Sequence, residues 1–90
     1  MDTRLTTLER KALNHAFKSA RGNGHDFGFI EEIVKGMRPL KAQAVGALVV
    51  SLQKKGVIEV HDPITTDSGT WTQFTWEIPI PEVVKLTEAS

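Results

Sequence analysis

The sequence predicts an α+β fold in which three helices are followed by a two- to three-stranded antiparallel sheet. Apolar residues recur every three or four positions up to about residue 54, and after Val57 they alternate with polar residues. The first spacing is typical of amphipathic helices and the second of strands with one buried face. The chain has 90 residues, 40% of them hydrophobic, which suits one small domain. We expect residues 1–80 to form this domain and residues 81–90 to be a polar C-terminal tail, either loose or docked as a short helix.

The first helix is the best marked. Thr6 and Glu9 stand in the spacing of a capping box, in which the hydroxyl and the carboxylate each accept a backbone N–H at the helix start. The segment Arg21-Gly22-Asn23-Gly24 ends the helix, because glycine and asparagine tolerate the backbone of a C-cap. Its predicted inward positions are Leu5, Leu8, Ala12, Leu13, Ala16, Phe17 and Ala20.

A second, shorter helix is predicted from about Phe29 to Lys35, with Asp26 or Gly28 as its cap and Gly36 at its end. Just ahead of it, residues 25–27 are a candidate for a short extra strand.

The third helix is predicted to begin at Pro39, since proline has no N–H to leave unsatisfied at a first helical position, and to stop on Lys54-Lys55-Gly56. At about 100° per residue its apolar positions share one face, which we expect to be core. The expected core positions are Ala44, Val45, Leu48, Val49 and Leu52. The opposite face would carry Gln43, Gly46, Ala47, Val50, Gln53 and Lys54.

Two strands are predicted after this helix, Val57 to Val60 and Trp71 to Ile78, because the apolar spacing there is two. The residues between them, 61–69, are rich in turn formers and predict a loop that closes a long hairpin. Pro79 and Pro81 end the pairing, as proline cannot donate to a β-ladder.

The order helix, helix, helix, strand, strand, with the junction Leu48-x3-Leu52-x2-Lys55-Gly56-Val57-Ile58, resembles winged helix-turn-helix proteins. This superfamily includes the MarR-like regulators and small winged-helix proteins of bacteria and phages. The resemblance covers roughly residues 5–79. It implies a small DNA-binding protein, such as a transcriptional regulator, whose third helix enters the DNA groove while the wing contacts the backbone. It also implies DNA-contacting roles for Arg38, Lys41 and Gln43 near the start of that helix.

The wing departs from this pattern in its charge. No Lys or Arg occurs between Val57 and Pro79, whereas Asp62 and Asp67 lie in the loop. Residues 38–56 carry four basic and no acidic groups, while residues 57–90 carry one basic and six acidic groups. Phosphate contacts need cations, so the wing does not match a DNA-binding role.

Two kinds of partner therefore remain open. Duplex DNA would be bound by Arg38, Lys41, Gln43 and Lys54, although Lys54 is equally explained as complementing the helix dipole. Specific DNA binding by so small a module would call for a homodimer. The alternative is a protein-interaction module with an acidic wing that does not bind DNA. It would use the smooth outer face at Ala47 and Val50 together with Trp71, a candidate aromatic anchor for a partner. Alternatively, Trp71 packs against Ile64 or the tail.

Catalysis, cofactors and metals have no support in the sequence. It contains no cysteine, and its three histidines lack the close spacing of metal ligands. No nucleophile, base and orienting group can be nominated together, so we expect a protein that is not an enzyme. No run of 18 apolar residues is present, and we expect a cytoplasmic protein without a membrane segment.

Overall fold

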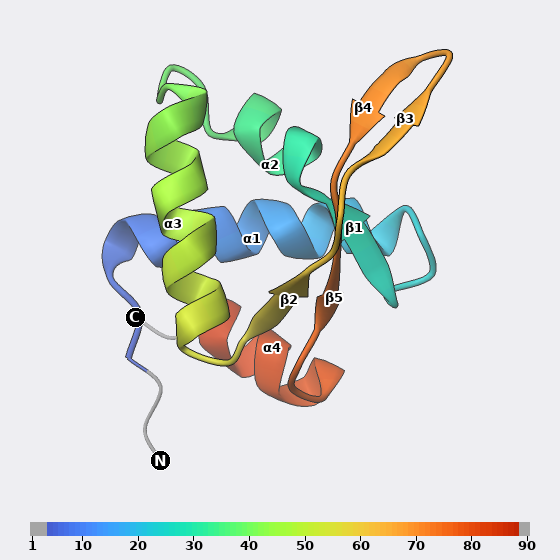
Figure 1. Cartoon of the computed structure of the whole chain (residues 1–90). Coiled ribbons are helices and arrows are strands. Elements are labelled where there is room, and N and C mark those ends of the chain that lie inside the picture. Colours follow the sequence, from blue (N-terminus) through green and yellow to red (C-terminus); the bar gives the residue numbers. More distant parts are fainter. Residues whose placement is uncertain (1–3, 89–90) are drawn as a thin grey trace.

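The computed structural model describes residues 4–88, and the described chain has an α+β architecture with four helices and small antiparallel sheets (Figure 1). A two-stranded hairpin projects from the body of the molecule. The elements in chain order are α1 (Thr7–Arg21), β1 (Phe27–Phe29), α2 (Ile30–Gly36), α3 (Ala42–Lys54), β2 (Ile58–Val60), β3 (Ile64–Thr66), β4 (Gly69–Trp71), β5 (Gln73–Trp76) and α4 (Ile80–Glu88).

The predicted α+β class is confirmed, but the predicted order of elements is wrong. A strand, β1, separates the first two helices, and a fourth helix follows the sheet. This order is not the usual winged-helix order. The extra strand suggested at residues 25–27 exists, although it begins two residues later because its pairing partner is β5, from Phe27 opposite Thr75 to Phe29 opposite Gln73.

The main sheet has the order β1-β5-β2, and all its pairs are antiparallel. Phe74 in the central strand lies opposite Gly28 on one side and Val60 on the other, and its side chain is fully buried. A Cβ atom at Gly28 would lie 2.6 Å from Cζ of Phe74 and 2.9 Å from the hydroxyl oxygen of Ser19. Such distances are well inside van der Waals contact, so this position has room only for glycine.

Two predictions for residues 61–78 are wrong in detail: the loop at 61–69 and the single strand from Trp71 to Ile78. The loop contains β3 and β4, which form their own hairpin with Ile64 opposite Trp71. Thr72 interrupts the predicted strand because its backbone is bonded to the start of α2. Its N–H donates to Oε1 of Glu31 at 2.6 Å, and its carbonyl accepts from the N–H of Ile30 at 2.8 Å.

Helix α1 is the central element, contacting α2, α3, α4 and β1. The predicted capping box is confirmed: the Thr6 hydroxyl accepts from the Glu9 N–H at 3.1 Å, and the Glu9 carboxylate accepts from the Thr6 N–H at 2.7 Å. Most of the predicted apolar stripe is inward, but Leu8 is 45% exposed. Leu8 lies at the edge of the stripe, beside Lys11, where it lines a hollow described below.

Helix α3 begins later than predicted. Residues 37–40 form a turn in which the Leu40 N–H donates to the Met37 carbonyl at 3.0 Å, and Lys41 is the N-cap with an extended backbone. Pro39 therefore precedes the helix, because packing of Leu40 against the core closes the chain into a turn first. Ala44, predicted to be core, is exposed, since it lies about 100° around the helix from the fully buried Val45 and so falls at the edge of the core face. The predicted stop at Lys54-Lys55-Gly56 is confirmed.

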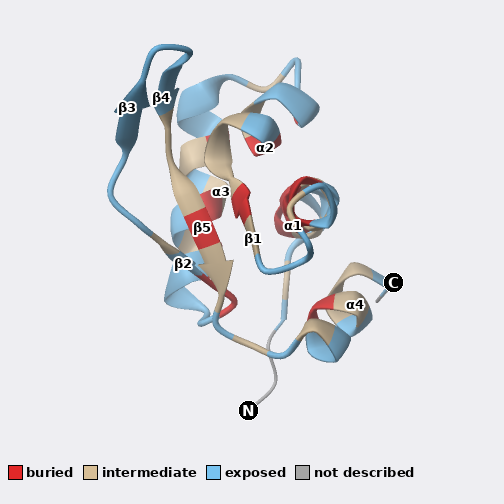
Figure 2. Ribbon diagram, turned by 90° about the vertical axis from the view of Figure 1, so that its right-hand side faces the viewer, coloured by how far each residue is buried: buried red, intermediate tan, exposed pale blue. Residues whose placement is uncertain are grey.

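The core lies between α1, α2, α3 and the inner face of the sheet, and α1 and α4 lie on the same side of that sheet (Figure 2). Of the segment predicted as a tail, residues 81–88 belong to α4, and residues 89–90 lie outside the described part. Val83 of this helix is fully buried and Leu86 packs against the core. Of the two predicted alternatives for this segment, loose or docked as a short helix, the structure shows the docked helix. No helix within residues 4–88 is long and apolar enough to cross a bilayer.

Candidate functional site

The outward face of α3 is the surface that the sequence singles out, and it is open to solvent. Gln43, Ala47, Val50 and Gln53 are all exposed on it, as predicted, and Val50 is 48% exposed. A Cβ at Gly46 would meet no atom within 4 Å, so this side of the helix is unobstructed as well. The side chains of Ala47 and Val50 on this face are small, and no charged residue lies between Lys41 and Lys54.

Cations stand at both ends of this face. Lys41 is the N-cap residue and Lys54 lies in the last turn, and both are exposed. Arg38 is also exposed, but it belongs to the turn between α2 and α3 rather than to the helix. Of the predicted DNA-binding residues, Lys41, Gln43 and Lys54 therefore share one helix, and Arg38 stands apart from it.

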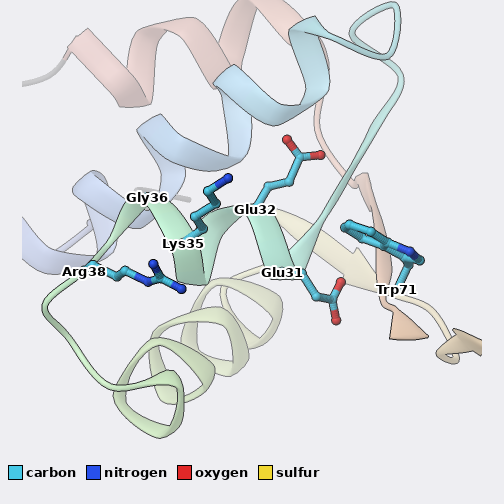
Figure 3. Close-up of a pocket in the computed structure, with 6 residues that line it drawn as sticks. All are labelled: Glu31, Glu32, Lys35, Gly36, Arg38 and Trp71. Atoms are coloured by element: carbon cyan, nitrogen blue, oxygen red, sulfur yellow. The ribbon is translucent and has the colours of Figure 1, made fainter. Parts of the chain in front are cut away.

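Arg38 lines an open hollow of about 770 Å³ along α2 (Figure 3). Its wall is made by Glu31, Glu32, Lys35, Gly36, Arg38 and Trp71. Both carboxylates come from the first turn of α2, and both cations lie at or beyond its last turn. Opposite charges thus line the same hollow, together with Trp71, which lies at the right of the view in Figure 3.

Trp71 has partners within its own chain. It lies opposite Ile64 in the hairpin, and its ring meets that of Phe29 edge-on with centroids 5.6 Å apart. Its indole N–H donates to the Ser68 hydroxyl at 3.1 Å. Packing against Ile64 was one of the two predicted roles, and the contact with Phe29 was not predicted. The hollow that Trp71 lines contains no residue of α3, so Trp71 does not extend the surface made by Ala47 and Val50.

The hairpin and the outer side of the sheet are acidic. Asp62 and Asp67 are exposed, and the part of the chain from Val57 to Pro79 contains no Lys or Arg. The side chains of Glu59 and Glu77 interact across β2 and β5, and this hydrogen bond and the repulsion between the two charges raise the pKa of Glu77. The negative charge expected for the wing therefore continues onto the sheet.

Lys55 has a structural role that the sequence does not reveal. Its ammonium donates to Oε1 of Glu9 at 2.6 Å and to the Arg4 carbonyl at 2.7 Å, while the Ser51 hydroxyl donates to the other oxygen of Glu9. Glu9 is only 3% exposed. This ion pair joins residues 46 positions apart in the sequence. From the sequence, the capping box alone indicated a structural role for Glu9.

Comparison with known proteins identifies no relative: no family model and no curated protein matches the sequence. Nor do three or more His, Cys, Asp or Glu side chains gather into a possible metal site anywhere in residues 4–88. The candidate site consequently rests on the geometry of α3 and its surroundings.

Proposed function

We propose that this chain is a winged-helix-like module that binds double-stranded DNA through α3. The observation that carries the proposal is the outward face of α3, which is exposed, small and uncharged, with Lys41 at one end and Lys54 at the other. In this reading α2, the turn and α3 form the helix-turn-helix, and the β3–β4 hairpin is the wing.

The dimensions of α3 suit a DNA groove. Its 13 residues span about 20 Å at 1.5 Å per residue. The major groove of B-DNA is about 12 Å wide and admits an α-helix, and small side chains let the backbone approach the base edges closely. Gln43 near the leading end would hydrogen-bond an adenine, and the two lysines would contact phosphates on either side of the groove.

The acidic hairpin limits where the DNA can lie. Asp62 and Asp67 are exposed and would repel phosphates. We therefore propose that the hairpin stays clear of the backbone, and that the contacts come from α3 and from Arg38 in the preceding turn. With so few phosphate contacts, specific binding requires two copies of the module about 34 Å apart on the duplex.

The test is fluorescence anisotropy with a labelled duplex over a salt series. We expect affinity to fall as salt rises, and Lys41→Gln to reduce the slope of log K against log salt by about 0.9, the release of one phosphate contact. Lys85→Gln is the matched control, because it removes an equally exposed cation from α4. If no duplex binds even at low salt, or if both variants behave alike, the proposal is wrong.

A second candidate function is supported by Val50, whose side chain is 48% exposed next to Ala47. Exposed apolar side chains on a helix also suit a protein partner, including a second copy of this chain. Sedimentation of the wild type and of Val50→Lys separates the readings. Self-association through α3 predicts a dimer that the variant abolishes, whereas DNA binding without self-association through α3 predicts that free wild type and variant both sediment as monomers.

A further inference from the structure

A second hollow, of about 240 Å³, lies between α1 and the turn that precedes α3. It is lined by Leu8, Lys11, His15, Gly36, Met37, Arg38, Pro39 and Leu40. Two cations and an imidazole thus face it, and no carboxylate is among its lining residues. This distinguishes it from the larger hollow, which two carboxylates line. We name it the basic hollow.

The walls of the basic hollow are held by packing. Lys11 and His15 are four residues apart in α1, so their side chains lie on the same face of that helix. The ring of His15 lies against Gly36, where a Cβ would be 2.9 Å from its Cε1 atom. Met37 is buried and its carbonyl closes the turn that carries Arg38. Residues from two elements distant in sequence, α1 and the turn before α3, therefore line one volume.

The cations of the basic hollow have no acidic partner in the described chain. The one ion pair within residues 4–88 joins Lys55 to Glu9, so neither Lys11 nor Arg38 forms an ion pair there, although Arg38 also lines the larger hollow together with Glu31 and Glu32. Leu8, Pro39 and Leu40 supply the apolar part of the lining.

We propose that Lys11, His15 and Arg38 form a binding site for a phosphate group. A phosphate has several acceptor oxygens, so it can take hydrogen bonds from an ammonium, a guanidinium and an imidazole at once, and a guanidinium can bind it through two N–H groups. The volume of the basic hollow accommodates one such group. The phosphate comes either from the backbone of DNA lying on α3 or from a free phosphate ester, since both carry the same oxygens. The site does not depend on the proposed function.

The first arm of the test uses inorganic phosphate and the whole chain. We expect saturable NMR shifts of the Gly36 amide and the His15 ring, absent with sodium chloride at equal ionic strength. Lys11→Gln and Arg38→Gln should each weaken phosphate binding about tenfold, the loss of one charge-assisted hydrogen bond, while Lys85→Gln should not. Both replaced side chains are exposed, so the variants are expected to fold, which far-UV circular dichroism would verify.

The second arm adds an unlabelled duplex to the phosphate-loaded protein. Displacement of phosphate, together with weaker duplex binding by Lys11→Gln, supports the site and identifies its ligand as a backbone phosphate. Phosphate binding without any duplex binding supports the site with a free ester as ligand, while the DNA proposal fails. Shifts that do not saturate, that sodium chloride reproduces, or that both variants leave unchanged would overturn the site itself.

Discussion

Replacement of Glu9 by Gln would measure how strongly the start of α1 is tied to the end of α3. Burial of this carboxyl alone would raise its pKa. The bonds from Lys55, from the Ser51 hydroxyl and from the Thr6 N–H outweigh burial and lower the pKa from 4.5 to about 2. The carboxylate therefore stabilises the folded chain, and Glu9→Gln removes that contribution while keeping the size of the side chain.

The magnitude follows from the lowered pKa. Each tenfold change in an acid constant corresponds to about 1.4 kcal/mol, so the step from 4.5 to about 2 corresponds to about 3 kcal/mol. The Lys55 side chain is 33% exposed, and water screens its charge, so we expect a loss of about 2 kcal/mol at neutral pH. Because the folded pKa is the lower one, this stability is fully present above pH 4.5 and disappears as the pH falls to about 2.

Urea unfolding followed by tryptophan fluorescence, repeated at several pH values from neutral downward, is the assay. The difference between wild type and Glu9→Gln should shrink below pH 4.5, since the carboxyl becomes protonated in the unfolded wild-type chain before it does in the folded one. Asp62→Asn, which alters an exposed carboxylate, is the control and should change stability by less than about 0.5 kcal/mol. A Glu9→Gln effect that stays constant across the pH range would refute the electrostatic reasoning.

Three further outcomes are expected. Gly28→Ala should lower the free energy of unfolding by about 1–3 kcal/mol, because its Cβ would lie 2.6 Å from the ring of the buried phenylalanine opposite it; Gly46→Ala, which meets no atom within 4 Å, should instead raise it by up to about 1 kcal/mol through helix propensity. Burial and the charge of a neighbouring lysine lower the pKa of His15 from 6.5, so its protonation favours unfolding. Stability should decline as the pH falls below 6.5 in the wild type and decline less in His15→Gln, as measured by urea midpoints. In NMR titrations the pKa of Glu77 should lie above 4.5, and Glu59→Gln should bring it back toward that value; an unchanged Glu77 pKa would contradict the coupling.

Local signals account for the parts of the fold that the sequence predicted. The capping box at Thr6 and Glu9 and the glycine after Arg21 predicted the bounds of α1 because each cap depends on residues within one helical turn. The end of α3 at Lys54 was found for the same reason. For α1, α2, α3 and β2 the class of segment, helix or strand, followed from periodicity.

Features that depend on distant partners were missed. The strand β1 has three residues and exists because β5, more than 40 positions later, pairs with it. Helix α4 depends on burying Val83 against the rest of the chain. A periodicity argument sees neither partner, so it had no means of placing the strand between two helices or of choosing between a loose and a docked tail.

The candidate site likewise has one part that the sequence predicted and one part that it did not. The exposure of Gln43, Ala47 and Val50 was predictable from helical geometry. The basic hollow was not, because it forms where α1 meets the turn around Arg38, and the sequence separates these segments by more than 20 positions. Pro39 also misled the prediction, as it suits a first helical position yet lies in the turn before α3.

The interruption of the strands at Thr72 couples the position of the β3–β4 hairpin to that of α2. The hairpin forms no ladder with the main sheet, and Thr72, which joins β4 to β5, is bonded through both its N–H and its carbonyl to the first turn of α2. The first turn of α2 therefore holds the base of the hairpin in place. A force on the hairpin tip that moves Thr72 must either break these two hydrogen bonds or carry the start of α2 with it, and either response reaches the hollow between Glu31 and Arg38.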